Sequence, residues 1–340
     1  MLSKNGLVHA YKSFVKYSSL LCELRHRNLF LIRCDMILSV LRGVTPAEYY
    51  MFGFDVLPRA ARKNFVPISL SRKASRELND HCSWNILENK FYAGSVLAPY
   101  YKRPCIHTAG LSLDDFKAFA EKNKKFIYKP VGTNGGDGVK VFDTRESDPE
   151  EAFNAITAMP RGVLEGWIVQ HEELNKLSDR AVHTVRLHTI HDGDAGDIDV
   201  FGACLTVAPF GEIANLHFDS VLAMLVNCET GVVYSNAIDR EKNEVYELFP
   251  GTDIPVKGYR LPDWDRAISL VKAAAAAVPE IRFIGWDVAF SKDGPVICEG
   301  NCRSVGVMNR QSHLYGEAAY AESGRAVIEK HLRRNAKSGR

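Results

Sequence analysis

Lys129-Pro-Val-Gly-Thr-Asn-Gly-Gly-Asp-Gly-Val139 contains four glycines within seven residues, between two short β-rich runs. The runs are Phe126–Val131 and Val139–Phe142, so the stretch predicts a hairpin with a glycine-rich loop. Because glycine has no Cβ, such a loop can bring backbone N–H groups against phosphate oxygens. A Walker loop or a dinucleotide-binding fingerprint would lead into a helix, whereas a strand follows here. A flexible hairpin without a ligand is the alternative interpretation.

A second hairpin is predicted near the C-terminal end, where Phe283–Phe290 and Pro295–Asn301 flank the turn signal Asp293-Gly294. If the turn is centred on Asp293, Asp287 and Glu299 lie opposite each other on one face of the ladder. Like charges placed in this way destabilise a hairpin unless something neutralises them. A hard divalent cation with oxygen ligands does so.

Magnesium is the cation that we expect at this pair of carboxylates, because it takes one or two carboxylates and completes its shell with phosphate oxygens and water. Strand side chains alternate, so Asn301 shares the face of Glu299, while Trp286, Val288 and Phe290 point into the core. A solvent-facing pair of acids is the alternative interpretation.

A third feature is the run from Asp179 to Ile190, in which alternation puts Val185 and Leu187 on one face and Arg186 and His188 on the other. We therefore expect Arg186 to face a polar cleft. A guanidinium there can hold a phosphate or a carboxylate bidentately, and an intrachain salt bridge is the alternative.

The composition is that of a folded protein, with 46% apolar and 25% charged residues, and 340 residues suffice for two or three lobes. A net charge of +2 argues against a nucleic-acid binder, whose footprint would be strongly basic. Residues 1–110 nevertheless hold 16 basic and 7 acidic side chains. Solvated helix faces explain this bias, and a surface that meets an anionic partner or membrane headgroups is the alternative.

The longest apolar stretch near the N-terminus, Leu29–Leu41, is interrupted by Arg33 and Asp35 and is shorter than the ~20 residues that a membrane helix needs. We expect a core helix here and no transmembrane segment. No apolar run with a small-residue cleavage site follows the opening residues, so we expect no secretory signal and a cytoplasmic location.

The patterns predict an α+β fold with helices first. We expect a helical N-terminal region at residues 1–80, a small lobe with the glycine-rich loop at 81–170, and a large lobe with the carboxylate pair at 171–325. Residues 326–340 form a basic tail, which we expect to be frayed from His331 to Arg340.

These stretches, in this order, resemble the ATP-grasp superfamily and in particular its sugar-transfer-associated branch. The resemblance extends over nearly the whole chain, and it is carried by Asp35-Met-Ile37, Asn89-Lys90, Lys129–Val139, Leu164-Glu165, Gln170-His171, His183–Arg186, Gly285–Asp287 and Gly294–Asn301. It implies the ATP-grasp fold, in which two α+β lobes with antiparallel sheets grip ATP, here preceded by the helical N-terminal region.

The resemblance also implies roles for the residues of the small lobe. Lys90 and Lys129 would contact the α- and β-phosphates of ATP. The glycine-rich loop, with Gly135, Gly136 and Gly138, would close over them.

Further roles follow from the same resemblance. Leu164–Trp167 would be a hinge that offers backbone groups to adenine, with Glu165 or Glu172 near the nucleoside. Asp287, Glu299 and Asn301 would bind Mg²⁺. Arg186 would steady the transferred phosphoryl group or an acyl phosphate, which makes Arg186 and Lys129 the catalytic candidates.

The implied activity is that of an ATP-dependent ligase, which activates a small-molecule carboxylate as an acyl phosphate for attack by an amine. Polysaccharide or natural-product biosynthesis is the setting that the branch suggests. Two alternatives use the same cleft: a kinase that phosphorylates a hydroxyl, and a non-catalytic nucleotide-binding partner of a glycosyltransferase.

Overall fold

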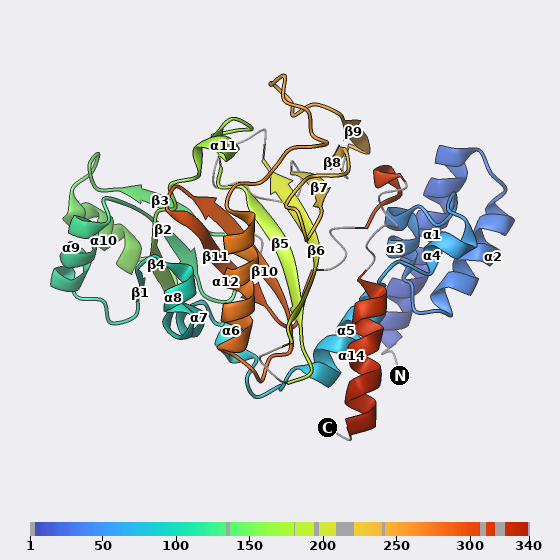
Figure 1. Cartoon of the computed structure of the whole chain (residues 1–340), viewed down its shortest axis with the longest axis horizontal. Helices are drawn as coiled ribbons and strands as arrows, with labels where there is room; N and C mark the ends of the chain where they lie inside the picture. Colours follow the sequence, from blue (N-terminus) through green and yellow to red (C-terminus); the bar gives the residue numbers. More distant parts are fainter. Residues whose placement is uncertain are drawn as a thin grey trace.

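The computed structural model describes residues 4–133, 137–179, 181–193, 197–208, 221–239, 242–306, 311–316 and 324–338. Within these residues, a helical N-terminal part precedes two antiparallel sheets, one of four strands and one of seven (Figure 1). The predicted α+β class with helices first is therefore confirmed.

The N-terminal part consists of α1 (Lys4–Arg25), α2 (Leu29–Val40), α3 (Pro46–Phe52), α4 (Arg59–Arg62) and α5 (Ile68–Leu78). Local sequence determines where the helices begin. The side chain of Asn28 accepts hydrogen bonds from the N–H groups of Phe30 and Leu31 at the start of α2. Thr45 and Glu48 form a capping box at the start of α3.

These helices cover one face of the seven-stranded sheet. Met36 and Phe52 are fully buried in an apolar cluster that also contains Ile238 of that sheet. The buried residues of α2 are Ile32, Met36 and Ser39. The expectation of a core helix is therefore wrong for the outer side of α2, because the described chain packs against one side only. None of the described helices has the length and apolar character that a membrane crossing requires.

The small lobe is built on a four-stranded sheet with the order β1-β4-β2-β3, and short helices lead into it. Its elements are β1 (Cys105–His107), α9 (Leu113–Lys122), β2 (Lys125–Pro130), β3 (Lys140–Asp143), α10 (Pro149–Thr157) and β4 (Gly162–Gly166). The helices that precede it are α6 (Asn85–Glu88), α7 (Lys90–Val96) and α8 (Ala98–Tyr101), and their buried apolar side chains belong to the apolar core of the large lobe. Strands β2 and β3 are the predicted hairpin. Phe116 of α9, Phe126 of β2 and Ile156 of α10 share the apolar core of this lobe.

The large lobe is built on a seven-stranded sheet with the order β11-β10-β5-β6-β7-β8-β9, in which all neighbours are antiparallel. Its elements are α11 (Glu172–Asn175), β5 (Thr184–Ile190), β6 (Asp199–Val207), β7 (Leu222–Val226), β8 (Ala237–Asp239), β9 (Glu244–Tyr246), α12 (Trp264–Ala276), β10 (Phe283–Ser291) and β11 (Gly294–Asn301). Helix α12 lies over β10 and β11 (Figure 1). Trp286, Val288 and Phe290 are buried with Val271 of α12, as predicted.

The described chain ends with the short helix η3 (His313–Tyr315) and with α14 (Arg325–Ser338). Ile328 and Leu332 of α14 pack in one cluster with residues of α5. His331 is buried between two carboxylates, 2.5 Å from Asp192 and 2.9 Å from Asp199. The prediction of a frayed basic tail is therefore wrong for α14, because its apolar and ionic contacts hold it against the body of the protein.

Candidate active site

Three charged side chains lie side by side across neighbouring strands of the large sheet. Arg186 of β5 is opposite Asp287 of β10, and Asp287 is opposite Glu299 of β11. Arg186 donates from Nε to Oδ1 of Asp287 over 2.6 Å and from Nη2 to Oδ2 over 2.8 Å. The intrachain salt bridge considered for Arg186 is therefore present, and it is bidentate.

A β-bulge produces the pairing of the two carboxylates. The turn between β10 and β11 is the two-residue Lys292-Asp293, and an unbroken ladder from it would put Cys298 opposite Asp287. The register shifts by one residue beyond Val288, so Glu299 takes that place. The predicted pairing is confirmed, although the turn centre assumed for it is wrong.

Positive charges of three side chains act on Glu299. Burial raises the pKa of the Glu299 carboxyl above its usual range, and the negative charge of Asp287 raises it further. The positive charges of Lys90, Lys129 and Arg186 act in the opposite direction without offsetting these effects. The two lysines and the arginine are thus close enough to act on one carboxylate. We call Lys90, Lys129, Arg186, Asp287 and Glu299 together the charged cluster.

The two lysines reach the cluster from different elements, α7 and β2. Lys90 is the first residue of α7, and its Nζ donates to the carbonyl of Thr133 over 2.7 Å. This contact ties Lys90 to the beginning of the glycine-rich loop. Lys129 lies on β2, and its Nζ donates to Oε2 of Glu165 on β4 over 2.8 Å. Both ammonium groups therefore have a hydrogen-bond acceptor that holds them in place.

Arg103 is a residue that the sequence analysis missed. Its side chain is 5% exposed, and Nε and Nη2 donate to Oε2 of Glu165 over 2.9 and 2.5 Å. Its Nη1 donates to the carbonyl of Ile297 on β11 over 2.6 Å. Burial alone would raise the pKa of Glu165, but Arg103 and Lys129 outweigh burial and lower this pKa to about 2. Arg103 thus connects Glu165 on β4 to β11, the strand that carries Glu299.

The segment after β11 supports Arg186 from another side. The carbonyl of Val305 accepts a hydrogen bond from Nη1 of Arg186 over 3.0 Å. This carbonyl lies over Gly285 of β10, where an added Cβ would be 2.2 Å from the carbonyl oxygen. Glycine at position 285 is therefore required for the backbone contact that orients Arg186.

The other predicted site residues have varied surroundings. Gly138 closes the glycine-rich loop at φ +72°, whereas Gly135 and Gly136 lie outside the described residues. Leu164 has its side chain in the core of the small lobe and its backbone between β1 and β2. Glu172 is exposed at the start of α11. The structure thus brings the lysines, Arg186 and the two carboxylates together, and it puts the side chain of Leu164 elsewhere.

The sequence matches the model of one protein family, described as sugar-transfer associated ATP-grasp, over residues 69–317. The chain belongs to the sugar-transfer associated ATP-grasp family. The matched range includes every residue of the charged cluster. A search of curated protein sequences finds no match to this ATP-grasp protein.

Several solved structures are distantly similar to this chain. The ATP-grasp ligase PsnB, complexed with its minimal precursor, has 14% identity and a TM-score of 0.42, covering 77% of this chain and 62% of that one. The D-alanine–D-alanine ligase of Bacillus anthracis, complexed with ATP, has 14% identity and a TM-score of 0.44, covering 76% and 71%. An N5-carboxyaminoimidazole ribonucleotide synthetase in its ADP complex has 15% identity and a TM-score of 0.38, covering 64% and 45%. This chain spans less than two thirds of the first and the third protein.

Membership of the ATP-grasp family implies a magnesium ion, and the residues at the end of β11 fit one. Asp287, Glu299 and Asn301 offer the oxygen ligands that Mg²⁺ prefers. The side-chain nitrogen of Asn301 is buried and has no hydrogen-bond partner among the described residues, so it can donate to an acceptor such as a phosphate oxygen, while the amide oxygen is the atom that suits a metal ion. Arg186 uses both oxygens of Asp287, but each carboxylate oxygen keeps a second lone pair.

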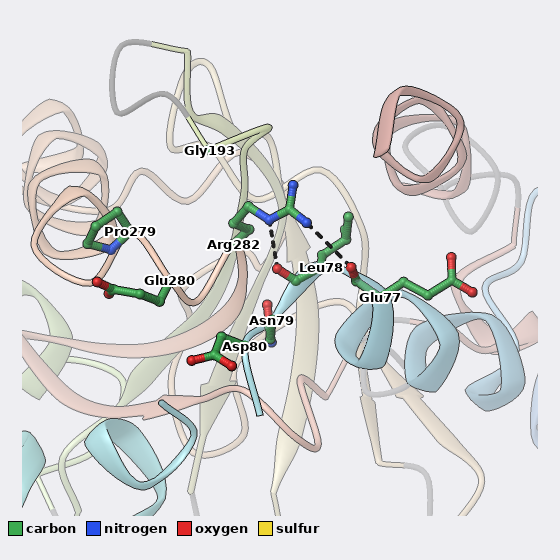
Figure 2. Close-up of a pocket in the computed structure, with 8 residues that line it drawn as sticks. All are labelled: Glu77, Leu78, Asn79, Asp80, Gly193, Pro279, Glu280 and Arg282. Atoms are coloured by element: carbon green, nitrogen blue, oxygen red, sulfur yellow. Dashed lines mark hydrogen bonds between the residues drawn. The ribbon is translucent and has the colours of Figure 1, made fainter. Parts of the chain in front are cut away.

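A separate pocket of about 300 Å³ lies where α5 ends against the start of β10 (Figure 2). It is lined by Glu77, Leu78, Asn79, Asp80, Gly193, Pro279, Glu280 and Arg282. Figure 2 shows Arg282 directed at the last carbonyls of α5, and it donates to those of Leu78 over 2.7 Å and Glu77 over 3.4 Å. The guanidinium of Arg282 therefore supplies hydrogen-bond donors to the last carbonyl groups of α5. The pocket shares no residue with the charged cluster.

Proposed function

We propose that this ATP-grasp protein binds MgATP between its two lobes and uses it to activate a carboxylate for attack by an amine. The protein would then be an ATP-dependent carboxylate–amine ligase. The observation that carries the proposal is the convergence of Lys90, Lys129 and Arg186 on Glu299 and Asp287. Cations from two lobes around paired carboxylates suit a polyphosphate accompanied by a divalent metal.

The proposed reaction has two steps. An oxygen of the substrate carboxylate attacks the γ-phosphorus of ATP, the bond from that phosphorus to the β–γ bridging oxygen breaks, and ADP leaves. The amine nitrogen then attacks the acyl carbon, phosphate leaves with the former carboxylate oxygen, and the amine loses a proton. Such chemistry needs positioning and charge stabilisation rather than a protein nucleophile.

Each residue of the charged cluster has a proposed part. Lys90 and Lys129 bind the α- and β-phosphates, with the glycine-rich loop over them. Arg186 neutralises charge on the transferring phosphoryl group. Asp287 and Glu299, together with Asn301, hold the magnesium ion, which supplies further positive charge at the phosphates.

We propose that the nucleoside of ATP binds near the segment that follows β4. Because the backbone of Leu164 is paired on both sides, the adenine contacts of the hinge Leu164–Trp167 are proposed for its later residues. Glu172 is proposed to lie near the ribose. Its exposed position at the start of α11 supports that part.

The proposed substrates are a small-molecule carboxylate and an amine. The family description, sugar-transfer associated, is what supports a role in polysaccharide or natural-product biosynthesis. A carboxylate on a sugar or on an amino acid fits that setting.

Trapping the acyl phosphate tests this function. The full chain is incubated with MgATP, a panel of carboxylates and hydroxylamine, and ADP and hydroxamate are both measured. We expect ADP to form together with an equal amount of hydroxamate, and only when a suitable carboxylate is present. A phosphorylated hydroxyl compound without hydroxamate would show a kinase instead. ATP binding without any turnover would favour a non-catalytic nucleotide-binding partner.

A further inference from the structure

The outer side of α2 is apolar and exposed. Six residues form this surface, here called the α2 ridge: Phe30, Leu31, Cys34, Ile37, Leu38 and Leu41. Their spacing of three and four residues places them on one helical face, opposite the buried side of α2. Phe30 is 71% exposed and Leu41 is 79% exposed. A continuous exposed apolar strip on a helix surface is typical of an interaction site, so the ridge calls for a partner.

No charged side chain interrupts the ridge. The two charged residues of α2 are turned toward neighbouring helices, where Arg33 donates to the hydroxyl of Ser18 over 3.2 Å. Asp35 accepts from the hydroxyl of Tyr49 over 2.6 Å and from Arg62 over 2.7 Å. The ridge is therefore a continuous apolar strip along the helix.

The exposed charge of residues 8–63, the region that carries the ridge, is mostly basic. The exposed basic residues of this region are Lys12, Lys16, Arg27, Arg42, Arg59 and Lys63. Arg27 and Arg42 lie just before and just after the ridge in the sequence. Among the described side chains of residues 8–63, the one exposed carboxylate is that of Glu23.

Two of the acidic residues in this region are buried and form internal contacts. Asp55 is buried beside Arg25, and Glu48 is buried in the capping box with Thr45. These carboxylates stabilise the helices and contribute little negative charge to the surface. The exposed charge of the region that carries the ridge is therefore mostly positive.

We propose that the α2 ridge docks the protein on membrane surfaces that contain anionic phospholipids. The ridge would enter the boundary between headgroups and acyl chains, and the basic side chains around it would lie among the phosphate groups. A second copy of the chain fits less well, because pairing two ridges would bring two basic surfaces together.

The position of α2 agrees with such a role. Helices α1 and α2 lie at the opposite end of the molecule from α9 and α10 of the small lobe (Figure 1). Docking through α2 would leave the sheets of both lobes away from the membrane surface. The charged cluster would stay accessible to its substrates.

Sedimentation with vesicles tests the proposal on the full chain. The vesicles contain phosphatidylcholine alone or phosphatidylcholine and phosphatidylglycerol in equal parts. We expect binding to the anionic vesicles only, weakened by added salt because the basic residues contribute through screened charges. The double variant Leu31→Glu/Leu41→Glu should lower the partition coefficient more than about tenfold, because it puts two carboxylates into the ridge.

A matched control comes from the large lobe, where Leu248 is 48% exposed. Leu248→Glu should sediment with anionic vesicles as the wild type does, and circular dichroism verifies the fold of each variant. Wild-type protein that stays in the supernatant, or that binds neutral vesicles equally well, would overturn the proposal. So would a dimer in analytical ultracentrifugation that Leu31→Glu/Leu41→Glu converts into a monomer, because the ridge would then be covered by a second copy.

Discussion

Replacing Arg186 by alanine is expected to lower kcat for carboxylate-dependent ADP formation about 10³-fold, the size of effect seen when a transition-state arginine is removed. Arg186 holds both oxygens of Asp287 and is itself held by the carbonyl of Val305. Its loss would leave Asp287 and Glu299 facing each other without the cation that pairs with Asp287. The transferring phosphoryl group would also lose its proposed source of positive charge. Steady-state assays with a coupled ADP readout measure the effect.

Two further variants separate this role from a general loss of stability. Arg186→Lys keeps a positive charge but not the two parallel hydrogen bonds, so we expect an intermediate rate. Arg334→Ala removes an arginine that donates to Asp192 over 2.7 Å at an exposed position, and it should change the rate by no more than about twofold. If Arg186→Ala keeps most of the wild-type kcat while Arg334→Ala behaves as expected, Arg186 takes no part in the reaction.

The second large effect is on stability. Glu165→Gln is expected to lower the free energy of unfolding by roughly 3–5 kcal/mol, the usual result of breaking a buried ion pair from one side. Arg103 would keep its buried charge and lose its carboxylate partner. Lys129 would lose the same partner. Chemical denaturation of the variant and of the wild type measures the difference.

The ion pair of Glu165 with Arg103 also predicts that the free energy of unfolding depends on pH. The pKa of Glu165 is lowered to about 2 in the folded protein, below its usual value of 4.5. The unfolded chain therefore binds this proton more readily, and the stabilisation by Glu165 is fully present above pH 4.5. It is lost as the pH falls from 4.5 towards 2. The wild type should lose stability over this range, and Glu165→Gln should lack that part of the loss.

A double-mutant cycle isolates the interaction. Arg103→Met/Glu165→Gln removes both charges, so it should cost less than the sum of the two single variants. The exposed pair of Lys117 and Glu150 is the reference, and Glu150→Gln should leave the free energy of unfolding nearly unchanged. Additive single effects at Arg103 and Glu165 would mean that the two side chains do not stabilise each other.

Short-range patterns in the sequence were sufficient to predict much of the charged cluster. The glycine-rich loop between two strand-like runs predicted the β2–β3 hairpin, because glycine and alternation act locally. Alternation also placed Arg186 on the polar face of β5 and Trp286 in the core. The resemblance to ATP-grasp proteins added Lys90, which no local pattern singles out.

Features that depend on distant contacts could not be predicted in this way. The bulge at Cys298 does not follow from the turn signal, and the correct pairing of Asp287 with Glu299 came from an incorrect turn centre. Arg103 is a single arginine in an irregular segment, and only the folded chain brings it against Glu165 and β11. The basic helix α14 looked like a tail because its partners, α5 and Asp192, are far away in the sequence.

The central claim is that the charged cluster binds ATP through a metal ion. Isothermal titration calorimetry of ATP into the full chain, with and without Mg²⁺, tests it most directly when the wild type is compared with Glu299→Gln. We predict that the wild type binds ATP only with Mg²⁺ and that Glu299→Gln loses this dependence while it stays folded. Wild-type protein that binds no ATP under either condition would contradict the account.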